Sequence, residues 1–491
     1  MLIVAVDKTS GVPVYRQICD RVACLIDAGT LAPGDRLPPT RVMARTAGVH
    51  RSSVLRAYGE LWALGYLESR PGSYTTIRRR APPTASVPGN GGSSLDWAAI
   101  TNPAIRAVRA GSDNLVSQSP TPPNVIDLSR LSADRRLTPI EDVRRSIRMV
   151  LADEGRELLD YGDPAGYRPL REAIARHMRV HGVAVEADEV VVTAGAQHAL
   201  DLVHRLLAAP GARVIVESPT YSAALSLMRL HGVDPVEVPM GPDGMDLDRV
   251  AGAMRRAKPA FVYTMPSFQN PTGVTTSHAH RERLLALGES HKVPIVEDGF
   301  EEEMKYFGKA ALPIKSIDRR GIVIYVGTFS KVVFPGLRLG WIAAPRACIE
   351  RVVAVARASC LSGNPLAQAV AARFCQSGRY EAHLRRIHTV YRRRMQTMLA
   401  GLAGHMPDGV EWTTPTGGYT LWLTVKDRRV SEVALYQRLL GGGVKVSPGR
   451  VFFAAPPRGA AFRVSIACVT DEEIAEATRR LGQALARALH E

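Results

Sequence analysis

Residues 322–343 read IVIYVGTFSKVVFPGLRLGWIA, with Lys331 at the centre of the stretch. The apolar run at 322–326 predicts a buried strand that breaks into a short polar turn just before the lysine. A lysine at the end of a buried strand is partly desolvated, which lowers its pKa. Its amine can then act as a nucleophile and form a Schiff base.

Three polar side chains lie close to this lysine in the sequence. Thr328, Ser330 and Arg338 supply the hydroxyl and guanidinium donors that a phosphate group binds. Taken alone, a strand that ends in Ser-Lys is equally compatible with an ordinary turn without chemistry. The remainder of the chain therefore has to decide between the two interpretations.

Similar apolar runs precede and include this one. They are short, rich in β-branched residues and each followed by a helical pattern: VVVTAG (190–195), RVIVESP (213–219), AFVYTMP (260–266), VPIVEDG (293–299) and GIVIYVG (321–327). This alternation predicts an α/β fold with a mostly parallel sheet covered on both faces. Ligands bind beyond the carboxyl ends of such strands. Residues 391–491, which mix helices with strands, predict a second, smaller subdomain.

One of these strand ends carries a glycine turn. Gly195 is followed by Ala196 and Gln197 at the start of a predicted helix. Free backbone N–H groups at such a helix start bind anions, although the motif is weak on its own.

The N-terminal residues 1–77 have a different pattern. Helices are predicted over 13–28, 41–47 and 51–65, and 65–77 predict a hairpin. The third helix repeats apolar residues at helical spacing: Val54, Leu55, Tyr58, Leu61 and Leu64. This order of elements predicts a winged helix-turn-helix.

Such a domain reads DNA with the start of its third helix. Base contacts are expected from Arg51, Ser52 and Ser53, with Arg56 one turn further on. Backbone phosphate contacts are expected from Arg41, Arg45 and Arg70. The alternative is a small basic helical domain that binds another protein.

Composition narrows the class of protein. The 491 residues carry a net charge of +16, and residues 1–80 hold twelve Lys and Arg against six Asp and Glu. This balance favours a polyanionic partner near the N-terminus. No apolar run approaches the length of a membrane span. The six scattered cysteines are expected to be reduced thiols in a cytoplasmic protein.

We expect three segments: a DNA-binding domain at 1–77, a linker at 78–125 and an effector domain at 126–491. The linker is predicted from three arginines followed by Pro, Gly and Ser. Residues 95–125 suggest no site.

The lysine segment, Ser-Lys followed by PGLRLGW, resembles that of fold-type I enzymes that use pyridoxal 5′-phosphate (PLP), the aspartate aminotransferase superfamily. Together with LAPGDRLPPTR and VHRSSVLRAYGELWALGYLESRPGS, nearly the whole chain resembles the MocR subfamily of GntR-type transcriptional regulators. The family usually has Ser at the position of His50.

The resemblance implies a role for each strand-end residue. Lys331 would form the aldimine with PLP, Asp298 would pair with the pyridinium nitrogen and Asn270 would bond the phenolic oxygen. Tyr221 would stack on the ring. The cofactor phosphate would be held by Ala196, Gln197, Thr328, Ser330 and Arg338.

Three further positions follow from the resemblance. Tyr161 would reach the phosphate across a dimer interface, and Arg463 would take the carboxylate of a substrate or effector. The alternative for Arg463 is a surface arginine on an edge strand. Phe300 replaces a tyrosine that the family usually has, so one hydrogen bond to the phenolic oxygen is missing and a perturbed aldimine pKa is expected.

Two functions compete. The first is a regulator that binds promoter DNA and senses an amino compound, or PLP itself, through the Lys331 aldimine. The second is a working PLP aminotransferase with an accessory DNA-binding domain. A GntR repressor without a cofactor would leave Lys331, Asp298, Asn270 and Arg338 unexplained. The resemblance also implies a head-to-tail homodimer.

Overall fold

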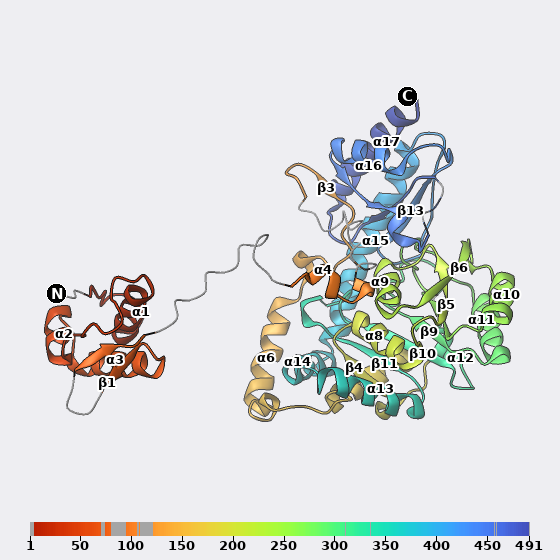
Figure 1. The fold of residues 1–491 in the computed structure, drawn as a ribbon. Helices are drawn as coiled ribbons and strands as arrows, with labels where there is room; N and C mark the ends of the chain where they lie inside the picture. Colours follow the sequence, from red (N-terminus) through yellow and green to blue (C-terminus); the bar gives the residue numbers. More distant parts are fainter. Residues whose placement is uncertain are drawn as a thin grey trace. The chain divides into compact units, whose positions relative to one another are not determined.

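The computed structural model describes residues 4–69, 74–79, 95–105, 108, 121–309, 311–333, 335–455, 457 and 459–490. The chain divides into two compact units, Met1–Thr101 and Asn102–Glu491 (Figure 1). Most of the predicted linker and the wing residue Arg70 lie outside the described residues. Within the segment predicted as a linker, the short helix α4 (Trp97–Ile100) is described.

The first unit is a three-helix domain with a two-stranded wing. Its elements are α1 (Val14–Asp27), α2 (Thr40–Ala47), α3 (Arg51–Ala63), β1 (Leu67–Ser69) and β2 (Thr75–Ile77). β1 and β2 pair antiparallel. Gly48 ends α2 with a φ of 62°, a conformation that glycine adopts at low cost, and so permits the tight turn into α3. The winged helix-turn-helix prediction is confirmed.

The apolar face predicted for α3 was partly wrong. Val54, Tyr58 and Leu61 are buried in the core of the unit, whereas Leu55 is 61% and Leu64 54% exposed. Leu55 follows Val54 by one residue, about 100° around the helix axis, so the two cannot share one buried face.

The second unit is built on an eight-stranded sheet with the order β4-β11-β10-β9-β8-β5-β6-β7. The strands are β4 (Val190–Thr193), β5 (Arg213–Ser218), β6 (Asp234–Gly241), β7 (Gly244–Met245), β8 (Phe261–Thr264), β9 (Ile295–Asp298), β10 (Val323–Thr328) and β11 (Gly340–Ala343). β10, β9, β8, β5 and β6 are mutually parallel, and β11 is antiparallel to both of its neighbours. The prediction of a mostly parallel α/β sheet is confirmed.

Helices cover both faces of this sheet (Figure 1). Val214 and Val216 of β5 point into one cluster, which includes α8 (Ala196–Leu207), α9 (Ser222–His231) and α13 (Arg346–Cys360). Ile215 between them points into another, with α10 (Leu247–Ala257), α11 (His278–His291) and α12 (Ile314–Ile317). Alternating side chains on each strand are therefore buried on opposite faces, as the continuous apolar runs require.

Further helices pack at the β4 side of the sheet. α6 (Ile140–Glu154), α7 (Arg168–Val180) and α14 (Pro365–Gln376) lie together, and α7 contacts β4. None of the described helices is long and apolar enough to cross a membrane.

The C-terminal part forms a smaller layer. A four-stranded sheet has the order β12-β13-β16-β15 and consists of β12 (Val410–Trp412), β13 (Thr420–Val425), β15 (Ser447–Pro448) and β16 (Ala461–Ser465). Its helices are α15 (Arg379–His405), α16 (Glu432–Gly441) and α17 (Asp471–His490). The 27-residue α15 runs from the large sheet into this layer (Figure 1). β3 (Ile126–Asp127) pairs with β14 (Val444–Lys445), so a strand that directly follows the predicted linker joins the smaller layer.

Candidate functional site

The carboxyl ends of the parallel strands surround one cavity of about 160 Å³. Ten predicted cofactor residues line it: Ala196, Gln197, Tyr221, Asn270, Asp298, Phe300, Thr328, Ser330, Lys331 and Arg338. They follow β4, β5, β8, β9 and β10, so a sheet edge assembles them from distant parts of the sequence. Tyr161 is not among the lining residues and is 80% exposed.

One end of the cavity has the donors of an anion site. Gly195 caps the start of α8 with a φ of 87°, and a Cβ atom there would lie 2.9 Å from Arg338 Nη2. Arg338 donates to the Ala194 carbonyl at 2.9 Å and has a left-handed φ of 50°. Strained backbone of this kind persists where the surroundings fix it, often at functional sites. Backbone N–H groups and a guanidinium meet here, as a phosphate requires.

Thr328 and Ser330 shape the turn on the same side. The Thr328 hydroxyl donates to the Leu339 carbonyl at 3.2 Å and accepts from the Ser330 amide at 3.1 Å. The first contact ties the end of β10 to the residue before β11, and the second orders the turn after β10. Both hydroxyls therefore belong to a backbone that is already ordered before a ligand binds.

Asp298 presents a free carboxylate oxygen. It is buried, and Tyr263 donates to its Oδ2 at 2.8 Å. Oδ1 has no hydrogen-bond partner among the described residues. Burial raises the pKa of this carboxyl to about 6. A buried acceptor without a donor is costly, so the site is suited to a protonated ring nitrogen that supplies one.

Lys331 lies three residues beyond the end of β10, which is Thr328. Its Nζ donates to the Leu131 carbonyl at 2.6 Å, and its own carbonyl accepts from the Tyr419 hydroxyl at 2.8 Å. Burial lowers the pKa of the amine, and the nearby Glu301 carboxylate opposes that shift. A lowered pKa increases the neutral, nucleophilic fraction of the amine.

Arg463 approaches the cavity through Asn270. Its Nη1 donates to Asn270 Oδ1 at 3.0 Å, and its Nη2 donates to the Ser129 carbonyl at 2.8 Å and the Ser447 hydroxyl at 3.1 Å. Burial lowers its pKa to about 10. β16 lies between β13 and β15, and Arg463 is only 8% exposed. The alternative of a surface arginine on an edge strand was therefore wrong.

Two polar side chains near this site, Tyr263 and Glu301, were not predicted from the sequence. Tyr263, on β8 beside β9, was hidden in an apolar run, although a tyrosine near a strand end is a detectable signal. Glu301 is 1% exposed, accepts from the Tyr419 amide at 3.0 Å and keeps Oε1 without a partner among the described residues. Burial raises the pKa of Glu301 to about 7. Its burial depends on the layer around Tyr419, which local sequence does not reveal.

Phe300 is 9% exposed and lines the cavity. It offers no hydroxyl there, in agreement with the sequence.

Of the predicted DNA-reading residues that the structure describes, Arg41 and Arg45 lie on α2, and the others lie on α3. Arg41, Arg45, Arg51 and Ser52 are exposed and Ser53 is half-buried. His50, the residue before α3, makes no cap to the helix and instead contacts the Ser52 hydroxyl through Nδ1 at 2.7 Å.

Arg56 differs from the other arginines of this face. Its guanidinium lies 3.8 Å from the centre of the Tyr15 ring, and its Nε is 3.6 Å from Glu60 Oε1. Arg51 has one weak contact, from Nε to the Thr40 hydroxyl at 3.4 Å. Arg51 is thus freer to reach a base than Arg56.

Two family models match this chain. Residues 124–481 match "Aminotransferase class I and II", and residues 14–77 match "Bacterial regulatory proteins, gntR family". The probable rhizopine catabolism regulatory protein MocR of Rhizobium meliloti is 31% identical over 92% of this chain and 90% of its own. The chain belongs to the MocR group of GntR-type regulators.

Two further similarities concern the whole chain and its aminotransferase-like part, respectively. The uncharacterized HTH-type transcriptional regulator YdfD of Bacillus subtilis is 29% identical over 97% of both chains. The crystal structure of LysN, an α-aminoadipate aminotransferase of Thermus thermophilus complexed with N-(5′-phosphopyridoxyl)-L-leucine, has a TM-score of 0.75. It is 31% identical and covers 81% of this chain and 100% of LysN.

The cofactor of this MocR-type regulator is PLP. The aminotransferase family that it joins is PLP-dependent, and the cavity fits the group on two independent features. Asp298 Oδ1 is a buried acceptor without a donor, and Gly195 leaves room beside Arg338 that a Cβ atom would fill. The chain is thus a DNA-binding regulator with a PLP-dependent, aminotransferase-like domain.

Proposed function

We propose that this MocR-type regulator responds to a small compound carrying an amine and a carboxylate, or to PLP itself, and does not work as a turnover enzyme. One observation carries this proposal. Lys331 and Asn270 line the same cavity, and Arg463 donates a hydrogen bond to Asn270. An amine-reactive group and a carboxylate-binding group are thereby set beside each other. The chain that holds them also carries a DNA-reading domain.

Each residue has a defined task in this proposal. When bound, PLP supplies an aldehyde that condenses with amines. Asp298 would pair with the protonated ring nitrogen through its unpartnered carboxylate oxygen, while Tyr263 donates to Oδ2. Arg338, Thr328 and Ser330, together with the N-terminus of α8, would hold the phosphate.

Lys331 moves between two roles. Its amine reacts while neutral, and the lowered pKa favours that form. Whenever Lys331 is not joined to PLP, its amine would donate a hydrogen bond to the Leu131 carbonyl, as it does in this structure. Glu301 lies near enough to lower the cost of a positive charge on that nitrogen.

Arg463 receives the carboxylate of the effector. Its bonds to Asn270, Ser129 and Ser447 hold the guanidinium plane in the absence of a ligand. A carboxylate that replaces these neutral acceptors gains charge-assisted bonds. Because β16 belongs to the smaller layer, binding of a carboxylate would act on how that layer sits against the large sheet. The response requires different affinities in the two arrangements.

The remaining tasks belong to the N-terminal unit and to assembly. Arg51, Ser52 and Ser53 would read bases of a promoter, while Arg41 and Arg45 would contact phosphates, as would Arg70, which lies outside the described residues. We place the protein in the cytoplasm, supported by six cysteines that are all free thiols. We also propose a head-to-tail homodimer, in which the exposed Tyr161 reaches the phosphate site of the partner.

The competing function is a PLP aminotransferase with an accessory DNA-binding domain. It is favoured by the nearly complete set of cavity residues and by the likeness to LysN. The test measures two quantities on the full-length protein: affinity for its own promoter fragment, with and without PLP and a panel of amino acids, and release of 2-oxo acid. A ligand-dependent change in DNA affinity without turnover supports the regulator. Turnover at ~1 s⁻¹ or faster, with DNA affinity unchanged by any ligand, would establish the enzyme.

A further inference from the structure

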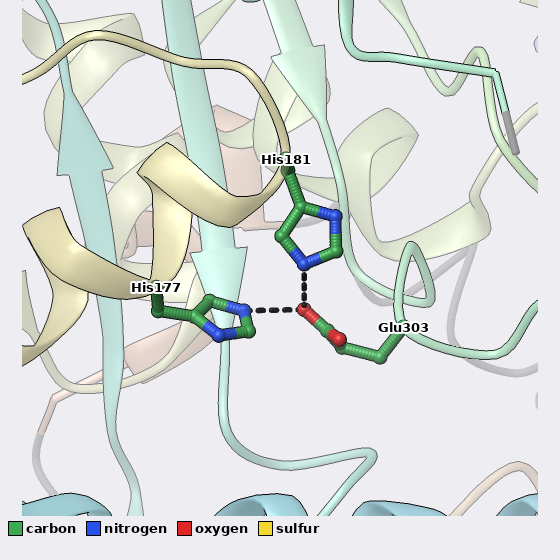
Figure 2. A group of neighbouring side chains, drawn as sticks. All are labelled: His177, His181 and Glu303. Carbon is green, nitrogen blue, oxygen red and sulfur yellow. Dashed lines mark hydrogen bonds and ion pairs between the residues drawn. The ribbon is translucent and has the colours of Figure 1, made fainter.

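Three ligand-type side chains meet at a point separate from the cofactor cavity. Figure 2 shows His177, His181 and Glu303 with their polar ends turned toward one another. His177 lies on α7 and His181 follows the helix as its cap residue, four positions on, so both imidazoles project from one side. Glu303 comes from the segment after β9, 126 residues away from His177.

A single carboxylate oxygen is shared by both imidazoles. Glu303 Oε1 contacts His177 Nε2 and lies 3.2 Å from His181 Nε2. The two rings are 4.9 Å apart, and Tyr380 packs edge-on against His177 at 5.4 Å. His388 of α15 contacts the backbone carbonyl of Glu303. This contact holds the segment that carries the Glu303 carboxylate.

We propose that His177, His181 and Glu303 form a binding site for a divalent transition-metal ion, with Zn²⁺ as the best fit. Their candidate ligand atoms all lie within 4.8 Å of one another. Two imidazole nitrogens and one carboxylate oxygen are a donor set of zinc sites that keep one position open. Ligand atoms around a tetrahedral zinc lie about 3.3 Å apart, which follows from zinc–ligand distances of about 2.0–2.1 Å. The present arrangement reaches that spacing when the separations of these atoms, at most 4.8 Å, change by up to about 1.5 Å.

The site has an entry path. It borders a cavity of about 670 Å³, whose other walls include Arg176, Glu381 and Cys375. Arg176 and Glu381 carry opposite charges, so together they do not repel a cation that enters through this cavity. The side chains of His177, His181 and Glu303 are 20%, 28% and 17% exposed, which leaves a face for a water molecule as the fourth ligand.

An ion pair alone explains less of this geometry. His278 and Glu282 form an ordinary exposed pair at 3.3 Å on one helix, and both side chains are more than half exposed. At the proposed site a second histidine converges on the same oxygen, the donors come from two distant segments and the pair is largely buried. Convergence of three donors onto one point is what a metal ion requires.

The cavity at the metal site is lined in part by the segment that also forms the cofactor cavity. Phe329 lies between Thr328 and Ser330 and lines the cavity beside the histidines. Glu303 stands two residues after the buried Glu301. Zn²⁺ at this point would hold α7 and the segment after β9 together.

The test uses the full-length protein, stripped of metal with a chelator and desalted. Zn²⁺ alone is titrated by calorimetry, and bound metal is then counted by mass spectrometry. Wild type is expected to bind one equivalent more than His181→Gln, His177→Gln or Glu303→Gln. Loss of one ligand should weaken binding by about 100-fold or more, since loss of a mere supporting residue already costs 10–100-fold. His278→Gln is the matched control and should bind like wild type.

A second readout reports the ligands. Co²⁺ replaces Zn²⁺, and the visible spectrum of His181→Gln is subtracted from that of wild type, so that absorption by the cofactor cancels. Bands of a four-coordinate Co²⁺ in the difference spectrum support the site. Equal Zn²⁺ uptake by wild type and the three variants, or no uptake by wild type at 100 µM Zn²⁺, would overturn the proposal. Thermal melting of each metal-free variant shows whether it is folded, and only folded variants count.

Discussion

The cofactor cavity and the DNA-reading face are built in opposite ways. The cavity collects side chains from five strand ends, and Asp298, Asn270 and Thr328 are buried and held by hydrogen bonds. The DNA-reading face uses neighbours on two short helices, and Arg41, Arg45 and Arg51 are exposed. A ligand in the cavity therefore meets groups that are already positioned, whereas DNA must order flexible side chains as it binds. Substitutions should be severe in the first region and graded in the second.

The largest expected effect is that of Lys331→Ala. The variant should lose every covalent attachment of PLP, because Lys331 supplies the amine at this cavity. It should still bind PLP weakly through the donors around Arg338. Borohydride reduction followed by peptide mass mapping measures the attachment. A pyridoxyl group found on a different lysine of the wild-type protein would refute the assignment, and Lys315→Ala serves as the control.

Asp298→Asn is expected to change stability and cofactor binding in opposite directions. Because burial raises the pKa of Asp298 from 3.8 to about 6, the folded protein without PLP binds this proton more tightly than the unfolded chain. The carboxylate therefore destabilises the folded protein above about pH 6, and that cost disappears as the pH falls toward 3.8. Removing it should stabilise the PLP-free protein at pH 7.5 by at most about 3 kcal/mol.

The same variant should bind PLP more weakly, since neutral Asn cannot balance a protonated ring nitrogen. Urea unfolding at pH 7.5 and pH 5, with and without PLP, measures both effects. In wild type, PLP affinity should fall as the pH drops through about 6, where Asp298 becomes protonated. If the PLP-free Asp298→Asn variant were less stable than PLP-free wild type at pH 7.5, the Asp298 carboxylate would not destabilise the folded protein as argued. Asp318→Asn, at a carboxylate whose pKa is lowered, should destabilise instead and is the contrasting control.

These two regions also show how far sequence alone reaches. Lys331 and Asp298 could be located because a strand end in a parallel sheet has a fixed direction, and the sequence pattern reveals the strands. Tyr263 and Glu301 were missed, since their contacts with Asp298 and Tyr419 depend on which strands and layers become neighbours. The error at Leu55 had a different cause: an apolar residue next to the buried stripe is indistinguishable from one within it until the helix is packed.

Arg463→Ala is expected to have an intermediate effect. Amino acids should lose about 10–100-fold in affinity, the value of one charge-assisted hydrogen-bonded contact, while simple amines without a carboxylate should be unaffected. Spectral titration of the cofactor absorbance measures both. Arg463→Lys keeps the charge but loses the paired donors and should recover only part of the affinity. If Arg463→Ala bound amino acids as tightly as wild type does, Arg463 would not be the group that binds the effector carboxylate.

The smallest expected effect lies within the DNA-reading face, where Arg56→Ala is compared with Arg51→Ala. Arg51 has only a weak contact to Thr40 and is available to a base, so its loss should cost about 1–3 kcal/mol on the specific site and less on random DNA. Arg56 is held over the Tyr15 ring and beside Glu60. The free energy lost when these two contacts break would offset the free energy gained from a new contact with DNA. Loss of Arg56 should therefore change specific binding by less than about 1 kcal/mol and lower the stability of the domain slightly.

Fluorescence anisotropy on specific and random duplexes, across a range of salt concentrations, separates base contacts from phosphate contacts. Each neutralised phosphate changes the slope of log affinity against log salt concentration by about 0.9. Equal losses for both arginines on the specific site would show that DNA pulls Arg56 away from Tyr15, and that even the more ordered side chain of this face is rearranged by its ligand.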